Sequence, residues 1–319
     1  MRTHARLVAA MLLVATLAAC SNVSGLSNAP RATFSQLACL DKNGDNRLNA
    51  ADAADPSLLP DFNADHLRDA KDAAFLQDID IPLNPQRDPC DGSGEPEYLV
   101  AHGYFDPSDV SCEAGRQAVL LVGVGGGVKN LKQSGDARGV RQIIDALQKK
   151  YDDRDVQTIG VISGQDMIGA ENGNIAMEQW LTNAVRVYLD RFPCLRVVLV
   201  GHSHGGVTVD VIAARLEDRY ASRFIDVVPL DRVDFAYGGD TTSYPQTIHV
   251  FNVYETNEPS PSLRGAPRDQ PNVENWDASA EQAPEGGTSG KPNKPVTHVS
   301  IDNAKSVRTR IIDEVISRS

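Results

Sequence analysis

Positive charge is scarce in this sequence. Its 319 residues include 31 lysines and arginines against 43 aspartates and glutamates, which gives a formal net charge of −12. This balance argues against binding to nucleic acid and against adsorption to anionic membrane surfaces. Long apolar runs are also lacking after the N-terminus, and no stretch there is long enough to span a bilayer. With 41% hydrophobic residues, the chain is nevertheless expected to build one sizeable domain and a small one.

The N-terminus has the pattern of a targeting segment rather than of a folded element. A basic start precedes an apolar run over residues 8–19, which is too short to cross a membrane. The run ends in Leu17-Ala18-Ala19-Cys20, which resembles the lipobox of bacterial lipoproteins. The resemblance implies that residues 1–19 are removed, that Cys20 is acylated and that residues 20–33 form a flexible tether. Because no charged sorting residue follows the cysteine, the expected address is the periplasmic face of the outer membrane; an ordinary secretory signal is the alternative.

Few cysteines remain after this segment. They are Cys39, Cys90, Cys112 and Cys194. An even number of cysteines in an exported protein predicts two disulfide bonds, for which three connectivities exist.

Residues 41–52 have the spacing of a twelve-residue calcium loop. Oxygen-bearing side chains recur at loop positions 1, 3, 5, 9 and 12, as a hard cation requires. The pattern resembles the loops of EF-hand and dockerin modules, which implies a structural Ca²⁺. It departs from them at Asn46, which replaces glycine, and at Asp52, whose short side chain replaces glutamate and should weaken binding. The predicted ligands are Asp41, Asn43, Asp45, Arg47, Asn49 and Asp52.

A second, weaker copy of this pattern follows. Its predicted ligands are Asp61, Asn63, Asp65, Asp69 and Asp72. An acidic helix-and-turn surface explains this copy equally well, and a set of Asx turns is the alternative for the first loop. Together the two loops predict a small, α-helical, EF-hand-like module over residues 34–80.

Strands and helices alternate after a proline-rich linker at residues 81–97. This alternation over residues 98–319 predicts a mostly parallel α/β sheet. The predicted strands are 118–122, 156–162, 197–200, 224–230 and 247–254, and the predicted helices are 140–151, 175–192, 208–220 and 301–317. Residues 256–296 are rich in proline, glycine and polar residues, which favours a long lid-type loop without the apolar stripe of an interfacial lid.

Residues 197–206 read Val-Val-Leu-Val-Gly-His-Ser-His-Gly-Gly and join an apolar strand to a helix. This is the context of a nucleophile elbow, in which Ser203 stands at the strand tip and Gly201 and Gly205 let strand and helix approach. Gly-His-Ser-His-Gly-Gly is similar to the elbow of bacterial true lipases, and the order of elements over residues 98–319 resembles the α/β-hydrolase fold. The resemblance implies helices on both faces of the sheet and a serine hydrolase site.

A nucleophilic serine needs a general base. Three histidines follow Ser203. His204 lies within the elbow and His249 within a predicted strand, which leaves His298, in the loop before the last helix. The resemblance places the catalytic base in that loop.

The orienting acid has three candidates. Asp231 ends the strand after the elbow helix, and ligand groups gather at that edge of parallel sheets, so it is preferred. Glu255 ends the next strand and is the main alternative. Asp234 is a third option.

Backbone N–H groups are expected to form an oxyanion hole. One belongs to His204, and the others to Gly125 and Gly126 in a loop that reads Gly-Val-Gly-Gly-Gly. That loop is similar to the glycine-rich oxyanion loops of lipases and esterases. A nucleotide-binding loop is disfavoured, because no Lys-Ser/Thr follows and Val128 breaks the Gly-x-Gly-x-x-Gly pattern.

The resemblance also bears on the disulfides. In α/β hydrolases strands 118–122 and 197–200 would be neighbours, so Cys112 and Cys194 would precede them at the same sheet edge. We therefore predict a Cys112–Cys194 bond, which leaves a Cys39–Cys90 bond to clamp the calcium module.

Taken together, the resemblances imply an envelope-anchored serine hydrolase with Ca²⁺ as a structural cofactor. It would cleave a small-molecule or lipid carboxylic ester through a Ser203 acyl-enzyme. The missing apolar lid stripe favours a soluble or short-chain ester. A calcium-binding lipoprotein scaffold or binding protein with an inactive hydrolase fold is the alternative. Whether a protein partner docks on the calcium module is left open by the sequence.

Overall fold

The computed structural model describes residues 40–59, 67–77, 79–82, 110–113, 116–126, 138–163, 173–233, 247–285 and 290–319. Some predicted features lie outside these ranges. They are the targeting segment with Cys20, the Cys39–Cys90 pair, Asp61, Asn63 and Asp65 of the second calcium loop, and Asp234. No helix within the described ranges is both long and apolar enough to cross a bilayer.

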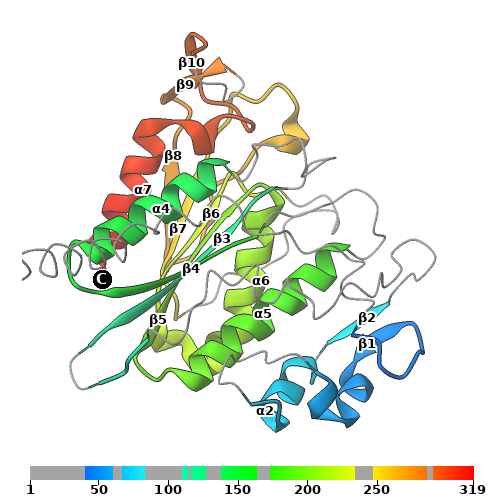
Figure 1. Ribbon diagram of the computed structural model, residues 1–319. Coiled ribbons are helices and arrows are strands. Elements are labelled where there is room, and N and C mark those ends of the chain that lie inside the picture. The colour runs from blue at the N-terminus through cyan, green and yellow to red at the C-terminus, as the bar shows by residue number, and fades with distance from the viewer. Residues whose placement is uncertain are drawn as a thin grey trace, which may run out of the picture.

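A six-stranded sheet forms the centre of the molecule, and all of its strands run parallel (Figure 1). The strand order is β4-β3-β5-β6-β7-β8. The strands are β3 (Ala118–Val124), β4 (Gln157–Ser163), β5 (Leu195–His202), β6 (Phe224–Leu230), β7 (Val250–Tyr254) and β8 (Val273–Asp277). All five strands predicted from the sequence are therefore present.

Helices cover both faces of this sheet (Figure 1). Successive side chains of β3 alternate between two cores, so that Leu120 packs with α5 and α6 whereas Leu121 packs with α4 and α7. Every residue of β3 is buried, as expected for a parallel strand covered on both faces. The helices are α4 (Arg138–Asp152), α5 (Gly173–Arg191), α6 (His204–Tyr220) and α7 (Lys305–Ser317). The predicted α/β-hydrolase fold with helices on both faces is confirmed.

The expectation of a lid-type loop over residues 256–296 is wrong in part. This segment contains β8, which pairs in parallel with β7 and closes one edge of the sheet. Its residues are half-buried or exposed, so their polarity conceals the strand in the sequence. The segment also holds β9 (Gln282–Pro284) and β10 (Asn293–Pro295), which pair antiparallel. The described part of this domain also holds three 3₁₀ turns, which are η6 (Ala221–Arg223), η7 (Pro261–Leu263) and η9 (Ile301–Asn303).

The N-terminal module contains turns where α-helices were expected. Its described elements are β1 (Arg47–Asn49), η2 (Ala50–Ala54), η3 (Pro56–Leu58), α2 (Ala70–Ala73), η4 (Ala74–Leu76) and β2 (Asp80–Pro82). Within these ranges the helices are short: α2 has four residues and the others are 3₁₀ turns, because capping residues begin a new turn every few positions. Asn49, Asp55 and Asp69 each accept a backbone N–H at the start of a new turn.

The module is fastened to α5 of the larger domain. Val187 of α5 belongs to the same apolar cluster as Leu48 and Phe75 of the module. The side-chain amide of Asn183 donates to the carbonyl oxygen of Phe75, and Arg186 donates to that of Ala74 at 2.7 Å. Module and sheet domain therefore share part of their core, and Figure 1 shows the module beside α5.

A disulfide bond joins Cys112 to Cys194, as predicted. The two cysteines are 82 positions apart in the sequence and their Cα atoms are 5.4 Å apart. Each precedes one of two paired strands, β3 and β5, so the bond lies at the amino-terminal edge of the sheet. It closes a long loop, which restricts the unfolded chain.

Candidate active site

The chain turns sharply at Ser203, between β5 and α6. This residue has φ 57° and ψ −126°, a conformation rare for L-residues and typical of a nucleophile elbow. A Cβ on Gly201 would lie 2.1 Å from the carbonyl oxygen of Gly205, and a Cβ on Gly205 would lie 2.2 Å from that of Val124. Both glycines are therefore required by the close approach of β5, α6 and β3, and the predicted strand–turn–helix geometry is confirmed.

Ser203, His298 and Asp231 form one hydrogen-bonded chain. Nε2 of His298 lies 2.8 Å from Oγ of Ser203, and Nδ1 of His298 lies 2.6 Å from Oδ2 of Asp231. All three residues are buried. Ser203 follows β5 and Asp231 follows β6, while His298 comes from the loop before η9, so the parallel sheet gathers them at its carboxyl edge.

Asp231, and not Glu255, approaches the imidazole. Oδ1 of Asp231 accepts hydrogen bonds from the backbone N–H of Glu255 at 3.2 Å and of Gly265 at 2.8 Å. These bonds hold its other oxygen toward the histidine. The carboxylate of Glu255 instead accepts the backbone N–H groups of Asn257 and Glu258. Both carboxylates are fully buried, but only Asp231 is hydrogen-bonded to the histidine.

Burial disfavours charge throughout this cluster. It lowers the pKa of His298 to about 4, which keeps the imidazole neutral and able to accept a proton. Burial raises the pKa of Asp231 to about 7, against the opposing effects of His202 and of two backbone hydrogen bonds. Burial and the neighbouring Asp231 raise the pKa of Glu255 to about 7 as well. Titration of this site is therefore expected between about pH 4 and 7.

His202 is a site residue that the sequence analysis missed. Its Nε2 lies 2.9 Å from the carbonyl oxygen of His298, and the two rings lie 5.0 Å apart. Its Nδ1 faces Oδ2 of the buried Asp302 at 3.8 Å. His202 thus ties the elbow strand to the loop that carries His298. Its position directly before Ser203 was the one available signal.

The glycine-rich loop passes beside the serine, as expected of an oxyanion loop. Gly125 and Gly126 directly follow β3, and a Cβ on Gly126 would lie 2.8 Å from Cβ of Ser203 and 3.3 Å from its Oγ. Only a glycine permits this approach. His204 is the first residue of α6, so its N–H group lies at the helix start next to Ser203. Gly126 and His204 are therefore adjacent to the serine, whereas Gly125 lies against Gly205, where an added Cβ would be 2.7 Å from the carbonyl oxygen of Gly125.

The first predicted calcium loop is closed by hydrogen bonds to its own carboxylates. Asp41 accepts the backbone N–H groups of Gly44 at 2.7 Å and of Asn46 at 2.9 Å, and Asn46 adopts the left-handed conformation, with φ 61°. Asp45 accepts the N–H of Arg47 at 2.8 Å. The loop therefore makes the turn at its sixth position that calcium loops make, with asparagine in place of their glycine.

Asp52 at position 12 is committed to backbone groups. Its carboxylate accepts the N–H groups of Lys42, Asn43 and Asn49, and the residue is 2% exposed. Within the described ranges, one set of three His, Cys, Asp or Glu side chains brings its ligand atoms within 4.8 Å of one another, and that set lies outside this loop. Position 12 is thus the weakest part of the predicted ligand set.

The described end of the second loop repeats this arrangement. Asp69 caps α2, and Asp72 accepts the N–H of Asp69 at 2.9 Å, just as Asn49 and Asp52 pair at η2. Both copies therefore use positions 9 and 12 as a capping box.

Comparisons with known proteins give distant structural neighbours. An α/β serine hydrolase without a lid from Xanthomonas campestris aligns with a TM-score of 0.40 and 12% identity over 65% of this chain and 84% of its own. Est1E from Butyrivibrio proteoclasticus, solved with ferulic acid bound, aligns with a TM-score of 0.39 and 11% identity over 63% of this chain and 88% of its own. A lipase-esterase related protein from Clostridium acetobutylicum aligns with a TM-score of 0.34 and 16% identity over 62% of this chain and 95% of its own. No protein-family model and no curated protein matches the chain. The fold assignment rests on the strand order and the turn at Ser203.

Proposed function

We propose that this protein is a serine hydrolase that cleaves carboxylic esters through an acyl-enzyme. The observation that carries the proposal is the chain of hydrogen bonds from Ser203 through His298 to Asp231, at 2.8 and 2.6 Å. A hydroxyl, a neutral imidazole and a buried carboxylate in this order activate a serine as a nucleophile. The strained turn at Ser203 supports the same role, because it places Oγ at the end of β5, within hydrogen-bond distance of His298.

In the acylation step, Nε2 of His298 takes the proton of Ser203 as Oγ attacks the ester carbonyl carbon. The carbonyl π electrons move to oxygen, where the N–H groups of His204 and of Gly126 or its neighbour stabilise the negative charge. The tetrahedral intermediate then collapses, the ester C–O bond breaks, and His298 returns the proton to the leaving alkoxide. Asp231 stabilises the transient imidazolium through Nδ1.

In the deacylation step, water replaces the alcohol. His298 removes a proton from the water molecule as its oxygen attacks the acyl carbon, and Ser203 leaves with that proton. His202 supports both steps as a positioning residue, because its ring holds the backbone carbonyl of His298. The products are a carboxylic acid, an alcohol and the free enzyme.

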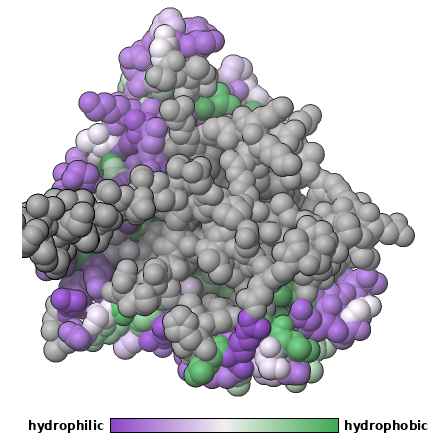
Figure 2. All heavy atoms as spheres, viewed as in Figure 1, coloured by the Kyte–Doolittle hydropathy of each residue, from purple (hydrophilic) through white to green (hydrophobic). Residues whose placement is uncertain are grey.

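A small ester is the substrate class that the surroundings of the site favour. Val299 is 57% exposed next to the buried His298, which offers apolar contact to a short acyl or alcohol group. The longest helix described within residues 256–296 is the three-residue η7, so no amphipathic lid helix lies there among the described residues. The described surface around β9 and β10 is largely hydrophilic (Figure 2). An extended lipid-binding face is not supported by these features.

A panel of p-nitrophenyl esters of increasing acyl length tests the proposal. Wild-type protein should turn over the short esters fastest, and Ser203→Ala should lower kcat by about 10⁶-fold. Ser262→Ala is the matched control, because this serine is exposed and hydrogen-bonds only within its own turn to Ser260. A folded wild-type protein without turnover on the panel would contradict the proposal and favour the calcium-binding scaffold.

We further propose that Asp41, Asn43, Asp45, Asn49, Asp52 and the backbone of Arg47 hold a structural Ca²⁺. The internal hydrogen bonds of the loop support its shape, and the commitment of Asp52 to three N–H groups predicts weak binding. A cation that binds the native state increases the free energy of unfolding, by about 2.7 kcal/mol at a concentration of 100 times Kd. It therefore raises the melting temperature. Calcium and chelator should therefore give different melting curves, and Asp41→Ala should remove the difference.

Anchoring through Cys20 is proposed from the sequence alone, since this residue lies outside the described ranges. Two or more acyl chains give stable membrane attachment. A Cys20→Ser variant should move the protein from the membrane fraction to the soluble periplasmic fraction. Equal membrane association of both forms would contradict the anchor.

A further inference from the structure

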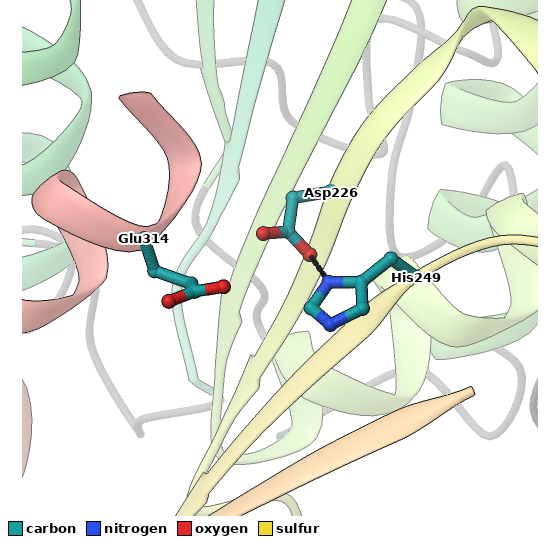
Figure 3. Close-up of side chains that lie close together, drawn as sticks. All are labelled: Asp226, His249 and Glu314. Carbon is teal, nitrogen blue, oxygen red and sulfur yellow. Dashed lines mark hydrogen bonds and ion pairs between the residues drawn. The ribbon is translucent and has the colours of Figure 1, made fainter. Parts of the chain in front are cut away.

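Three potential ligand side chains meet at the edge of the sheet opposite the candidate active site. Asp226 comes from the start of β6, His249 directly precedes β7, and Glu314 comes from α7 (Figure 3). One ligand atom from each lies within 4.8 Å of the other two. Because Asp226 lies on β6 and Asp231 directly follows this strand, five residues further on, this cluster is about 16 Å from the triad acid.

Asp226 carries an unmet requirement within this cluster. It is fully buried, and its Oδ1 lies 2.9 Å from Nδ1 of His249. Its Oδ2 is also buried but has no hydrogen-bond partner, and Figure 3 shows this oxygen on the side of Glu314. Nε of Arg318 is 3.9 Å from it, beyond hydrogen-bond reach. A buried carboxylate oxygen without a hydrogen bond is destabilising, and a cation between these side chains would satisfy it more closely than the distant Arg318 does.

From this geometry we infer that Asp226, His249 and Glu314 bind a divalent cation of the zinc class. One imidazole and two carboxylates form a mixed nitrogen and oxygen ligand set, which suits Zn²⁺ and similar transition metals. Calcium prefers six to eight oxygen ligands, so this site is chemically distinct from the N-terminal loop. Three protein ligands leave one tetrahedral position for water. The His249 side chain is 22% exposed, which gives an ion access to the cluster from solvent.

Arg318 is the competing cation at the rim of this cluster. Its Nε donates to Oε1 of Glu314 at 2.8 Å, and its Nη2 lies 3.6 Å from Oε2 of Glu274. The side chain is 36% exposed, so it is able to swing away from Glu314 while Glu274 keeps it nearby. An ion bound by Glu314 would be repelled by this guanidinium. The site therefore predicts that loss of the Arg318 charge strengthens metal binding.

The bound ion would fasten α7 to the sheet. Its ligands come from β6, from the residue before β7 and from α7, whose apolar side chains share one core. A metal that binds only the folded arrangement stabilises it by mass action. The expected consequence is a higher melting temperature with Zn²⁺, separate from ester hydrolysis at the other edge.

Cobalt spectroscopy of the full chain, produced without a histidine tag, tests the inference. With Ca²⁺ in excess to occupy the N-terminal loop, Co²⁺ should give one equivalent of tetrahedral visible absorption, and Zn²⁺ should displace it. Glu314→Gln and His249→Gln should each weaken Zn²⁺ binding by more than about 100-fold. This exceeds the loss of about 10–100-fold that is usual for residues that only support a metal ligand. Glu285→Gln is the control, because this acid is paired with Lys294 on β10.

Arg318→Gln provides a test with the opposite sign. It should bind Zn²⁺ more tightly than the wild type, since the competing charge is gone while the three ligands remain. If His249→Gln fails to fold, Glu314→Gln decides, because that side chain comes from α7 rather than from the sheet and its amide replacement has nearly the same size. Absence of tetrahedral Co²⁺ absorption in the wild type, equal affinity in Glu314→Gln, or weaker binding in Arg318→Gln would each overturn the inference.

Discussion

Strand β6 carries an aspartate–histidine pair at each of its two ends. At the carboxyl end, Oδ2 of Asp231 lies 2.6 Å from Nδ1 of His298. At the amino end, Oδ1 of Asp226 lies 2.9 Å from Nδ1 of His249. Both aspartates are fully buried, and burial raises the pKa of both carboxyl groups. The two pairs thus share their composition, their ring nitrogen and their strand.

The pairs differ in what completes them. The second nitrogen of His298 faces the hydroxyl of Ser203 at 2.8 Å, whereas His249 shares its aspartate with the carboxylate of Glu314 and the guanidinium of Arg318. A hydroxyl next to an oriented imidazole becomes a nucleophile, and a second carboxylate makes a metal ligand set. An aspartate–histidine pair therefore has no fixed function, because its third neighbour decides the chemistry.

The largest effect should separate the two acids at the carboxyl end. Asp231→Asn should lower kcat by about 10⁴-fold, because the imidazolium formed during attack loses its stabilising charge. Glu255→Gln is the matched control and should retain activity within about tenfold, since its carboxylate binds only nearby backbone N–H groups. Steady-state ester hydrolysis measures both. A larger loss of kcat in Glu255→Gln than in Asp231→Asn would show that Glu255, after β7, is the orienting acid instead.

Acid pH should act on the catalytic pair next most strongly. As the pH falls below about 7, Asp231 takes up a proton and no longer stabilises the imidazolium; toward pH 4, His298 itself becomes protonated and cannot accept the serine proton. Activity should therefore reach its plateau above about pH 8, fall to about half at pH 7 and be about 100-fold lower at pH 5. The pH dependence of kcat/KM reports this directly. Constant activity down to pH 5 would contradict the assigned groups, and His249→Gln should leave the profile unchanged.

A smaller effect is expected at His202, which positions the catalytic loop. His202→Leu removes the contact to the carbonyl oxygen of His298 and should lower kcat by about 10–100-fold with little change in KM, because a misplaced base slows chemistry rather than binding. His202→Gln keeps a side-chain donor and should restore part of the rate. If leucine and glutamine variants behave alike, the residue only fills space.

The smallest effect should come from the opposite end of β6. Asp226→Asn and His249→Gln remove the second pair and should change ester hydrolysis less than about twofold, because no group of that cluster reaches the reacting atoms. The same variants should lose the Zn²⁺-dependent rise in melting temperature. A large loss of activity with unchanged thermal stability would show that the two edges are coupled.

Much of the active site could be predicted because its signals are local. Ser203 lies in a five-residue motif between a strand and a helix, and Asp231 lies at a strand end. The Cys112–Cys194 bond followed once those strands were taken as neighbours. His298 was chosen by elimination among the few histidines after the serine, together with the place that the resemblance to α/β hydrolases gives the base. Local patterns of this kind can be recognised in a sequence without knowledge of the packing.

The missed features depend on packing instead. β8 is half-exposed, so its polar residues conceal the strand, and its place in the sheet is set by pairing with β7. The contact of His202 with the backbone of His298 spans 96 positions. Asp226 and Glu314 meet only because α7 packs over β6. Side chains brought together by long-range packing leave no spacing for a sequence to reveal.

Covalent labelling by a fluorophosphonate, read out by peptide mass spectrometry, tests the central role of Ser203 most directly. The probe reacts with serines that are activated by a neighbouring base. We expect one adduct per chain, located on Ser203, absent in Ser203→Ala and formed far more slowly in His298→Ala. Folded wild-type protein that remains unlabelled, or that carries the adduct on another serine, would contradict the assignment of a serine hydrolase.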